Sequence, residues 1–167
     1  MSSFDEDLSV YSDHYEVEVL INRPISQVWK QYVDIPSWVI THRIETVSGE
    51  PGTVGSITRV AFKRAQEMGM PPPHYHYCKL IKLVPERRWV LKTYAEKGGS
   101  YGCQEFHTFD EGRVSAVDSQ TTLVTFNLFS EIKAEAIARD PGGMNLDASR
   151  DGMQRNLENL KKVVEGR

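Results

Sequence analysis

The chain has 167 residues with 20 basic and 23 acidic side chains, which give a formal net charge of -3. This length suits one domain with a sizeable core. The Lys and Arg residues are scattered along the chain, which argues against nucleic-acid binding. No apolar run approaches the roughly 20 residues of a membrane-spanning helix. The acidic N-terminus lacks the apolar stretch of a secretory signal, and two cysteines argue against a disulfide framework, so we expect a soluble, cytoplasmic protein.

The first part of the chain predicts a strand followed by two short helices. Residues 1–13 are polar and acidic and are expected to form a flexible arm that precedes a single domain over 14–167. Apolar and polar side chains alternate over residues 15–21, which is typical of a strand with one buried face. Pro24 suits the first turn of a helix, and Pro36 begins a second short turn in which Trp38 and Ile40 are core candidates.

The middle of the chain is rich in strand-like sequence. Further strands are predicted over residues 54–62, 74–84, 87–96, 101–109 and 115–129. The turn signals between them are Gly49 to Gly52, Pro85-Glu86 and Asp110 to Gly112. Residues 63–73 contain three consecutive prolines, which a central strand does not tolerate, so this segment is interpreted as a loop or flap.

The C-terminal part predicts a long amphipathic helix. Residues 130–140 favour a short helix, and Pro141-Gly142-Gly143 reads as a hinge. From about Asn145 the sequence is helical to its end. Met153, Leu157, Leu160 and Val164 recur at spacings of four, three and four residues, so they form one apolar stripe.

Three local patterns resemble the helix-grip superfamily, also called START-like or SRPBCC. They are the strand that ends in Ile21-Asn22-Arg23-Pro24 before Val28-Trp29, the stretch Asp34 to Trp38, and the hairpin Leu83 to Trp89. The terminal helix fits as well, so the resemblance covers about residues 14–165. Members of the superfamily include polyketide cyclases and dehydratases, pollen-allergen-type carriers and lipid-transfer domains, and they share no single catalytic motif.

The resemblance implies an α+β fold in which a seven-stranded curved antiparallel sheet surrounds the long C-terminal helix, with two short helices after strand 1. A cavity is expected between the sheet and the helix. The segment 63–73 would lie near the mouth of that cavity. Its Met68 and Met70 would either line the entrance or fill a gap at the surface.

The predicted strand 101–109 places several chemically active side chains on one face. One face would carry Tyr101, Cys103, Glu105, His107 and Phe109, and the other Gly102, Gln104, Phe106 and Thr108. If the first set faces the cavity, Glu105 or His107 would have a shifted pKa and could serve as acid or base. The alternative is that this face points to solvent and Phe106 points inward.

His74, His76 and Cys78 share one face of the strand 74–84. Two histidines at this spacing can supply metal ligands, but a third would have to come from another strand, so cavity histidines without a metal or an exposed face are the competing interpretations. Lys79 and Lys82 have opposite parity, which requires either a bulge or a lysine whose amine extends to solvent.

The other candidate ligand contacts are mainly apolar. Val124, Phe126 and Leu128 are predicted to face inward, and the same parity would bring Asp118, Gln120 and Thr122 inward. For Asp118 the alternative, an exposed strand end, is favoured. The contact candidates outside the strands 74–84 and 101–109 are Trp89, Phe126, Gln120, Met68, Met70, Met153 and Leu157.

These features predict a cavity enzyme that resembles polyketide cyclases and dehydratases. It would perform cofactor-free and metal-free acid–base chemistry, a cyclisation, dehydration or lyase step, on an apolar aromatic or polyketide-like molecule. Glu105, His107, His76 and Tyr101 would be the working groups. The competing functions are a carrier of a hydrophobic ligand or lipid, which needs an apolar wall and one or two polar anchors, and a protein-binding module. A homodimer is the other partner considered.

Overall fold

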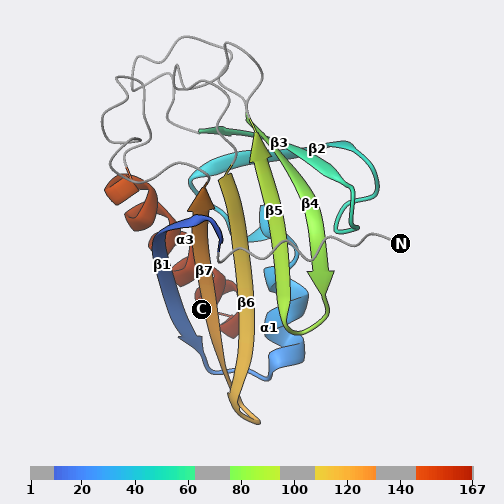
Figure 1. The fold of residues 1–167 in the computed structure, drawn as a ribbon. Helices are drawn as coiled ribbons and strands as arrows, with labels where there is room; N and C mark the ends of the chain where they lie inside the picture. Colours follow the sequence, from blue (N-terminus) through green and yellow to red (C-terminus); the bar gives the residue numbers. More distant parts are fainter. Residues whose placement is uncertain (1–9, 63–75, 95–107, 131–145, 167) are drawn as a thin grey trace.

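The protein folds as one curved antiparallel sheet with a long helix on its concave side (Figure 1). The structure, a computed structural model, describes residues 10–62, 76–94, 108–130 and 146–166. The strand order is β1-β7-β6-β5-β4-β3-β2, so the first strand joins the hairpin formed by the last two. The predicted seven-stranded sheet and long C-terminal helix are confirmed.

The boundaries of the elements agree with the sequence patterns in most places. The strands are β1 (Ser12–Ile21), β2 (His42–Ser48), β3 (Ile57–Phe62), β4 (His76–Val84), β5 (Arg88–Tyr94), β6 (Thr108–Asp118) and β7 (Thr121–Ser130). The helices are α1 (Ile25–Tyr32), the 3-10 turn η2 (Ile35–Ser37) and α3 (Leu146–Glu165). β1 begins at Ser12, so the last two residues of the expected arm belong to the sheet.

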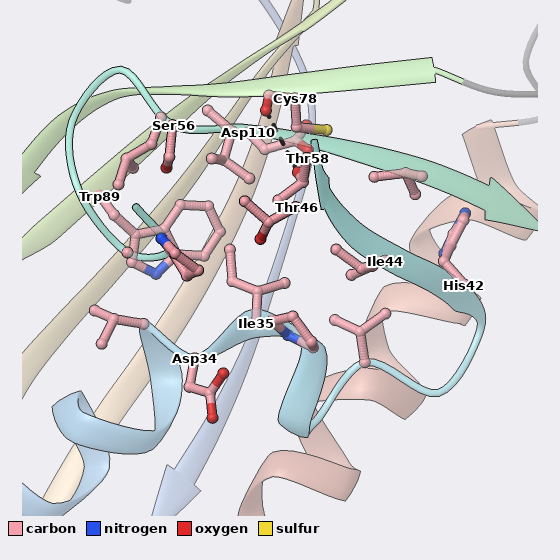
Figure 2. Close-up of a pocket in the computed structure, with 18 of the residues that line it drawn as sticks. Asp34, Ile35, His42, Ile44, Thr46, Ser56, Thr58, Cys78, Trp89 and Asp110 are labelled. Carbon is pink, nitrogen blue, oxygen red and sulfur yellow. Dashed lines mark hydrogen bonds between the residues drawn. The ribbon is translucent and has the colours of Figure 1, made fainter. Parts of the chain in front are cut away.

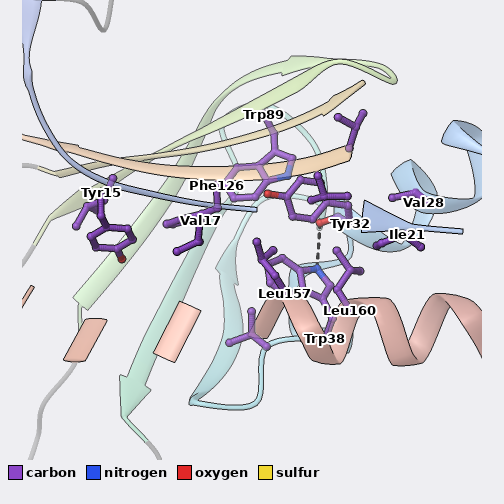
Figure 3. Packing of buried hydrophobic residues seen from close by; sticks show 14 of the residues in the cluster. Tyr15, Val17, Ile21, Val28, Tyr32, Trp38, Trp89, Phe126, Leu157 and Leu160 are labelled. Atoms are coloured by element: carbon purple, nitrogen blue, oxygen red, sulfur yellow. Dashed lines mark hydrogen bonds between the residues drawn. The ribbon is translucent and has the colours of Figure 1, made fainter. Parts of the chain in front are cut away.

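The core lies between the concave face of the sheet and α3 (Figure 3). Tyr32 of α1 lies at its centre, with its ring 5.3 Å from Trp38 and 5.2 Å from Trp89. Its hydroxyl donates to the carbonyl oxygen of Thr125, and the Trp38 Nε1–H donates to the carbonyl of Tyr32. Leu157 and Leu160 of the predicted apolar stripe are fully buried against these rings, which fixes the helix against the sheet.

The hairpin between β6 and β7 corrects the sequence prediction. Asp110-Glu111-Gly112 lies in the middle of β6 instead of in a turn, and the chain reverses after Asp118. The predicted final strand over 115–129 is therefore divided between β6 and β7. An Asp-Glu-Gly triplet has the composition of a turn, but pairing with β5 and β7 on both sides keeps it extended.

Further differences are local. The residue pattern did not locate β2, and Ile40 is 46 % exposed instead of buried. A bulge between Leu80 and Lys82 resolves the conflicting parity of the two lysines in β4. The predicted loop 63–73, the strand 101–109 up to residue 107, and the segment 130–143 beyond Ser130 lie outside the described residues. No helix in the described part of the chain is long and apolar enough to cross a membrane.

Candidate functional site

A cavity of about 380 Å³ opens between the sheet and the segment that joins α1 to β2 (Figure 2). Strands β2 to β7 supply most of the wall, residues 33–39 form the opposite side, and α3 contributes Met153. The wall is largely apolar. Its polar and titratable side chains are Asp34, His42, Thr46, Ser56, Thr58, His76, Cys78 and Asp110.

Asp110 is a titratable group in the middle of the sheet. It occupies the middle of β6, where alternation turns Asp110 and Gly112 toward the cavity and their neighbours Phe109 and Glu111 toward the convex face. Its Oδ2 accepts a hydrogen bond of 3.5 Å from Thr93 Oγ1, and that hydroxyl lies 3.3 Å from Cys78 Sγ. Asp110, Thr93 and Cys78, from three neighbouring strands, thus form one polar cluster.

Burial changes the protonation of this cluster. Removal from water disfavours the ionised carboxyl and raises the pKa of Asp110 from its usual 3.8 to about 7, although the hydrogen bond from Thr93 acts in the opposite direction. Burial raises the pKa of the Cys78 thiol to about 12, and the negative charge of Asp110 contributes a smaller part of this increase. Cys78 is therefore a protonated thiol and a poor nucleophile, whereas Asp110 exchanges its proton near neutral pH.

His76 of β4 is the second titratable group in the wall. Its ring meets the ring of His42 edge to face, with centroids 5.9 Å apart. Burial lowers the pKa of His76 from 6.5 to about 4, so the imidazole is neutral at physiological pH. A neutral imidazole offers one hydrogen-bond donor and one acceptor to a molecule in the cavity.

We expect the His76 ring to stay neutral from about pH 8 down to about pH 5. Because its pKa is depressed in the folded state, the unfolded chain binds the proton first, and folding should lose stability as the pH falls from about 6.5 to about 4, by up to about 3 kcal/mol. A side-chain NMR titration measures the pKa of the His76 ring, and the signal of this ring is assigned by its absence from His76→Gln. A midpoint near 6.5 would contradict the buried placement.

The wall opposite the sheet is held to α3 by an asparagine. Asn156 is 1 % exposed, and its Oδ1 accepts hydrogen bonds from the backbone N–H groups of Ile40, at 2.9 Å, and Thr41, at 3.3 Å. Its Nδ2 donates to Thr41 Oγ1, and Asn159 donates to the carbonyl oxygen of Trp38. The backbone between η2 and β2 is thereby fixed at one side of the cavity.

Trp89 forms an apolar part of the cavity wall because the strand beside it carries a glycine. Gly112 pairs with Trp89 across β5 and β6, and a Cβ atom at position 112 would lie 2.1 Å from Trp89 Cε2. The indole therefore lies flat over the backbone of β6, where it also contacts Tyr32 and Phe126.

The structure places six of the predicted site residues in described segments. His76, Trp89, Phe126 and Met153 line the cavity. Leu157 lies in the core behind the wall, and Gln120 lies in the exposed turn between β6 and β7, so neither reaches the cavity. The inward placement of Gln120 fails because the parity was carried through a turn that the sequence analysis did not recognise.

The other seven predicted residues lie outside the described segments. They are Met68, Met70, His74, Tyr101, Cys103, Glu105 and His107. The row from Tyr101 to His107 was expected to share a face with Phe109. In β6, Phe109 points to the convex face, where it packs with Val90 in a cluster separate from the main core.

Asp110 was not among the predicted site residues, because the triplet Asp110-Glu111-Gly112 has the composition of a turn. One available signal was the second polar triplet, Asp118-Ser119-Gln120, which suits a hairpin turn equally well and would have left Asp110 in a strand between apolar residues. Groups of three or more metal-binding side chains are absent from the described residues, so the two histidines of the wall do not belong to such a cluster there.

Comparison with solved structures decides the fold class. Norcoclaurine synthase from Thalictrum flavum, solved with dopamine and hydroxybenzaldehyde, aligns with 99 % of this chain and 94 % of its own at a TM-score of 0.65 and 12 % identity. This chain has the helix-grip fold. This is the fold that the strand, hairpin and terminal-helix patterns of the sequence indicated.

Two further helix-grip structures align over most of the chain. Ara h 8.0201 gives a TM-score of 0.62 at 16 % identity over 94 % of this chain and 99 % of its own. DynU16, a protein of the dynemicin biosynthetic locus, gives 0.58 at 15 % identity over 90 % of this chain and 46 % of its own. No family model matches the sequence, and no curated protein does. At these identities the shared property is the fold.

Proposed function

We propose that this helix-grip protein is a cofactor-free acid–base enzyme acting on a small, mainly apolar aromatic or polyketide-like molecule. The observation that carries the proposal is Asp110, a carboxyl group facing a largely apolar cavity with a pKa of about 7. A group whose pKa lies near the working pH is present in both forms, so it can both remove and return a proton.

Asp110 can serve as both the base and the acid in the dehydration of a hydroxy ketone. Its carboxylate takes a proton from the carbon next to the carbonyl, and the electron pair of the broken C–H bond moves toward the carbonyl oxygen. As the electrons return, the hydroxyl group on the next carbon leaves and takes the proton from Asp110, so that water and an unsaturated ketone are released and the carboxylate is regenerated. Neutral His76 supplies a hydrogen-bond donor for the developing oxygen charge. A cyclisation uses the same first step.

The solved relatives support an aromatic ligand. The norcoclaurine synthase structure contains two small aromatic molecules, and DynU16 belongs to a biosynthetic locus. The competing function is a carrier that holds a hydrophobic ligand unchanged. A carrier needs an apolar wall with one or two anchors, and it gains nothing from a buried carboxyl that titrates near pH 7.

Identification of the bound molecule tests the proposal. We expect native mass spectrometry of the purified protein to detect a retained small molecule, and denaturing extraction to recover an aromatic or polyketide-like compound. Incubation with the wild-type protein should convert a supplied precursor, whereas Asp110→Asn should bind it without conversion. A ligand that both proteins bind and leave unchanged would identify a carrier. A protein that retains nothing and is stabilised by no aromatic compound would exclude both functions.

A further inference from the structure

We infer that the preferred ligand of the cavity carries a protonated amine, which pairs with Asp110. This inference rests on the proposed function, because it concerns the same cavity, and it defines the charge of the molecule that the cavity selects. A carboxyl group inside a protein needs either a proton or a positive charge nearby. Among the described residues, no lysine or arginine lines the cavity.

The described part of the cavity lining carries carboxyl groups but no permanent cation. The described wall contains two carboxyl groups, Asp34 and Asp110, two histidines and no lysine or arginine. Asp110 accepts a hydrogen bond from the uncharged Thr93, and the described residues offer it no ion pair. His76 is neutral as well, because burial depresses its pKa. Asp34 adds a second negative charge at the exposed side of the wall.

The groups that face Asp110 from the neighbouring elements are neutral. Tyr15 of β1, Tyr32 of α1 and Cys78 of β4 all have raised pKa values, chiefly through burial and in part through the negative charge of Asp110. They therefore keep their protons at neutral pH, and none of them can neutralise a carboxylate.

The charged residues of the adjacent strands lie on the other face of the sheet. Lys92 precedes Thr93 in β5, and its Nζ lies 5.5 Å from the ring of Phe109 in the convex-face cluster. Glu111 follows Asp110 in β6 and is paired with Arg88 and Arg113. Strand alternation thus directs these cations away from the cavity.

An ammonium group on the ligand would complete this arrangement. Its charge would stabilise the ionised carboxyl, and one of its N–H bonds would donate to an acceptor site that Thr93 leaves open, while the other sites stay available for proton transfer. The pairing would also lower the pKa of Asp110, so that a cationic ligand converts Asp110 into a base at neutral pH. A carboxylate ligand of the same shape would be repelled.

Three naphthalene derivatives that differ in charge test the inference by isothermal titration calorimetry. The probes are 2-(1-naphthyl)ethylamine, 2-(1-naphthyl)ethanol and 1-naphthaleneacetate. We expect the amine to bind the wild-type protein at least about tenfold more tightly than the alcohol, and the carboxylate to bind most weakly. Asp110→Asn should remove the preference for the amine and leave the affinity for the alcohol within about twofold. Asp151→Asn removes an exposed carboxylate of α3 and should change nothing.

Proton release gives a second, independent measurement. Repeating the amine titration in buffers of different ionisation enthalpy should show release of nearly one proton at about pH 6 and about half a proton at about pH 7, and no release from Asp110→Asn. Equal affinities for amine and alcohol without proton release would overturn the inference but leave the proposed cavity function intact. Failure of all three probes to bind would overturn the inference and also count against an aromatic cavity.

Discussion

Asp110→Asn is expected to stabilise the folded protein at neutral and alkaline pH while it removes the acid–base chemistry. The wild-type carboxyl has a folded-state pKa of about 7 against 3.8 in the unfolded chain. A raised carboxyl pKa means that the folded state binds the proton more tightly. Its stabilising contribution is therefore complete below about pH 3.8 and is lost as the pH rises through about 7. Asparagine has no charge to bury and does not suffer this loss.

The expected gain grows with pH. One pKa unit is equivalent to about 1.4 kcal/mol. The raised pKa of Asp110 should therefore make Asp110→Asn more stable than the wild type by up to about 4 kcal/mol in the free energy of unfolding at about pH 8.5, and by almost nothing at about pH 4. The amide also faces the cavity, where water can satisfy its N–H groups. On a converted substrate, the same variant should lower kcat by about 10²- to 10⁴-fold.

Urea denaturation of both proteins at several pH values measures the stability difference. The contribution of His76 is present in both proteins and cancels in their difference, which isolates Asp110. The exposed carboxylate of Asp151 supplies the matched control, since Asp151→Asn should produce no pH-dependent difference. If the stabilities of wild type and Asp110→Asn run parallel at every pH, Asp110 has an ordinary pKa and the proposed chemistry loses its central group.

Gly112→Ala is expected to destabilise the protein by about 2 to 4 kcal/mol and to displace Trp89. The new methyl group would lie within 2.5 Å of three indole atoms, a distance that no van der Waals contact allows. Trp89 is 2 % exposed and is enclosed by Tyr32 and Phe126, so the ring cannot move away without disturbing the core. Overfilling a packed core forces side chains from their rotamers and shifts the backbone.

Gly152→Ala provides the matched control for this substitution. Gly152 lies inside α3, and an added Cβ would approach Thr41 Cγ2 only to 3.7 Å, an ordinary contact. Alanine is the better helix former, so this variant should be more stable than the wild type by up to about 1 kcal/mol. Chemical denaturation compares both variants, and near-UV circular dichroism reports the environment of the tryptophans. Wild-type stability and an unchanged spectrum of Gly112→Ala would show that Trp89 does not pack on Gly112.

The order of elements and the core could be predicted from the sequence because local patterns encode them. Period-two alternation in Tyr15 to Ile21 and the four-three-four spacing from Met153 to Val164 each define one apolar face, and both faces are buried in the structure. Pro24 and Pro36 mark the beginnings of the two short helices through their fixed backbone angle. These signals lie within a few neighbouring residues.

The position of the acid–base group was decided by tertiary structure. Asp110, Thr93 and Cys78 are far apart in the chain and meet only because β4, β5 and β6 pair in one register. A turn misplaced from 119–120 to 110–112 removes Asp110 from the sheet altogether. Its raised pKa depends on burial, which is a property of the packed fold.

The sequence by itself thus determined the first strand, the C-terminal helix and the apolar faces that bury each other, because these depend on local spacing. The cavity, the glycine that accommodates Trp89 and the burial of the Asp110 carboxyl depend on which strands become neighbours and on how many residues separate their turns. A shift of one residue in the register of a strand reverses which of its side chains face inward, so these features could not be predicted before the pairing of the strands was known.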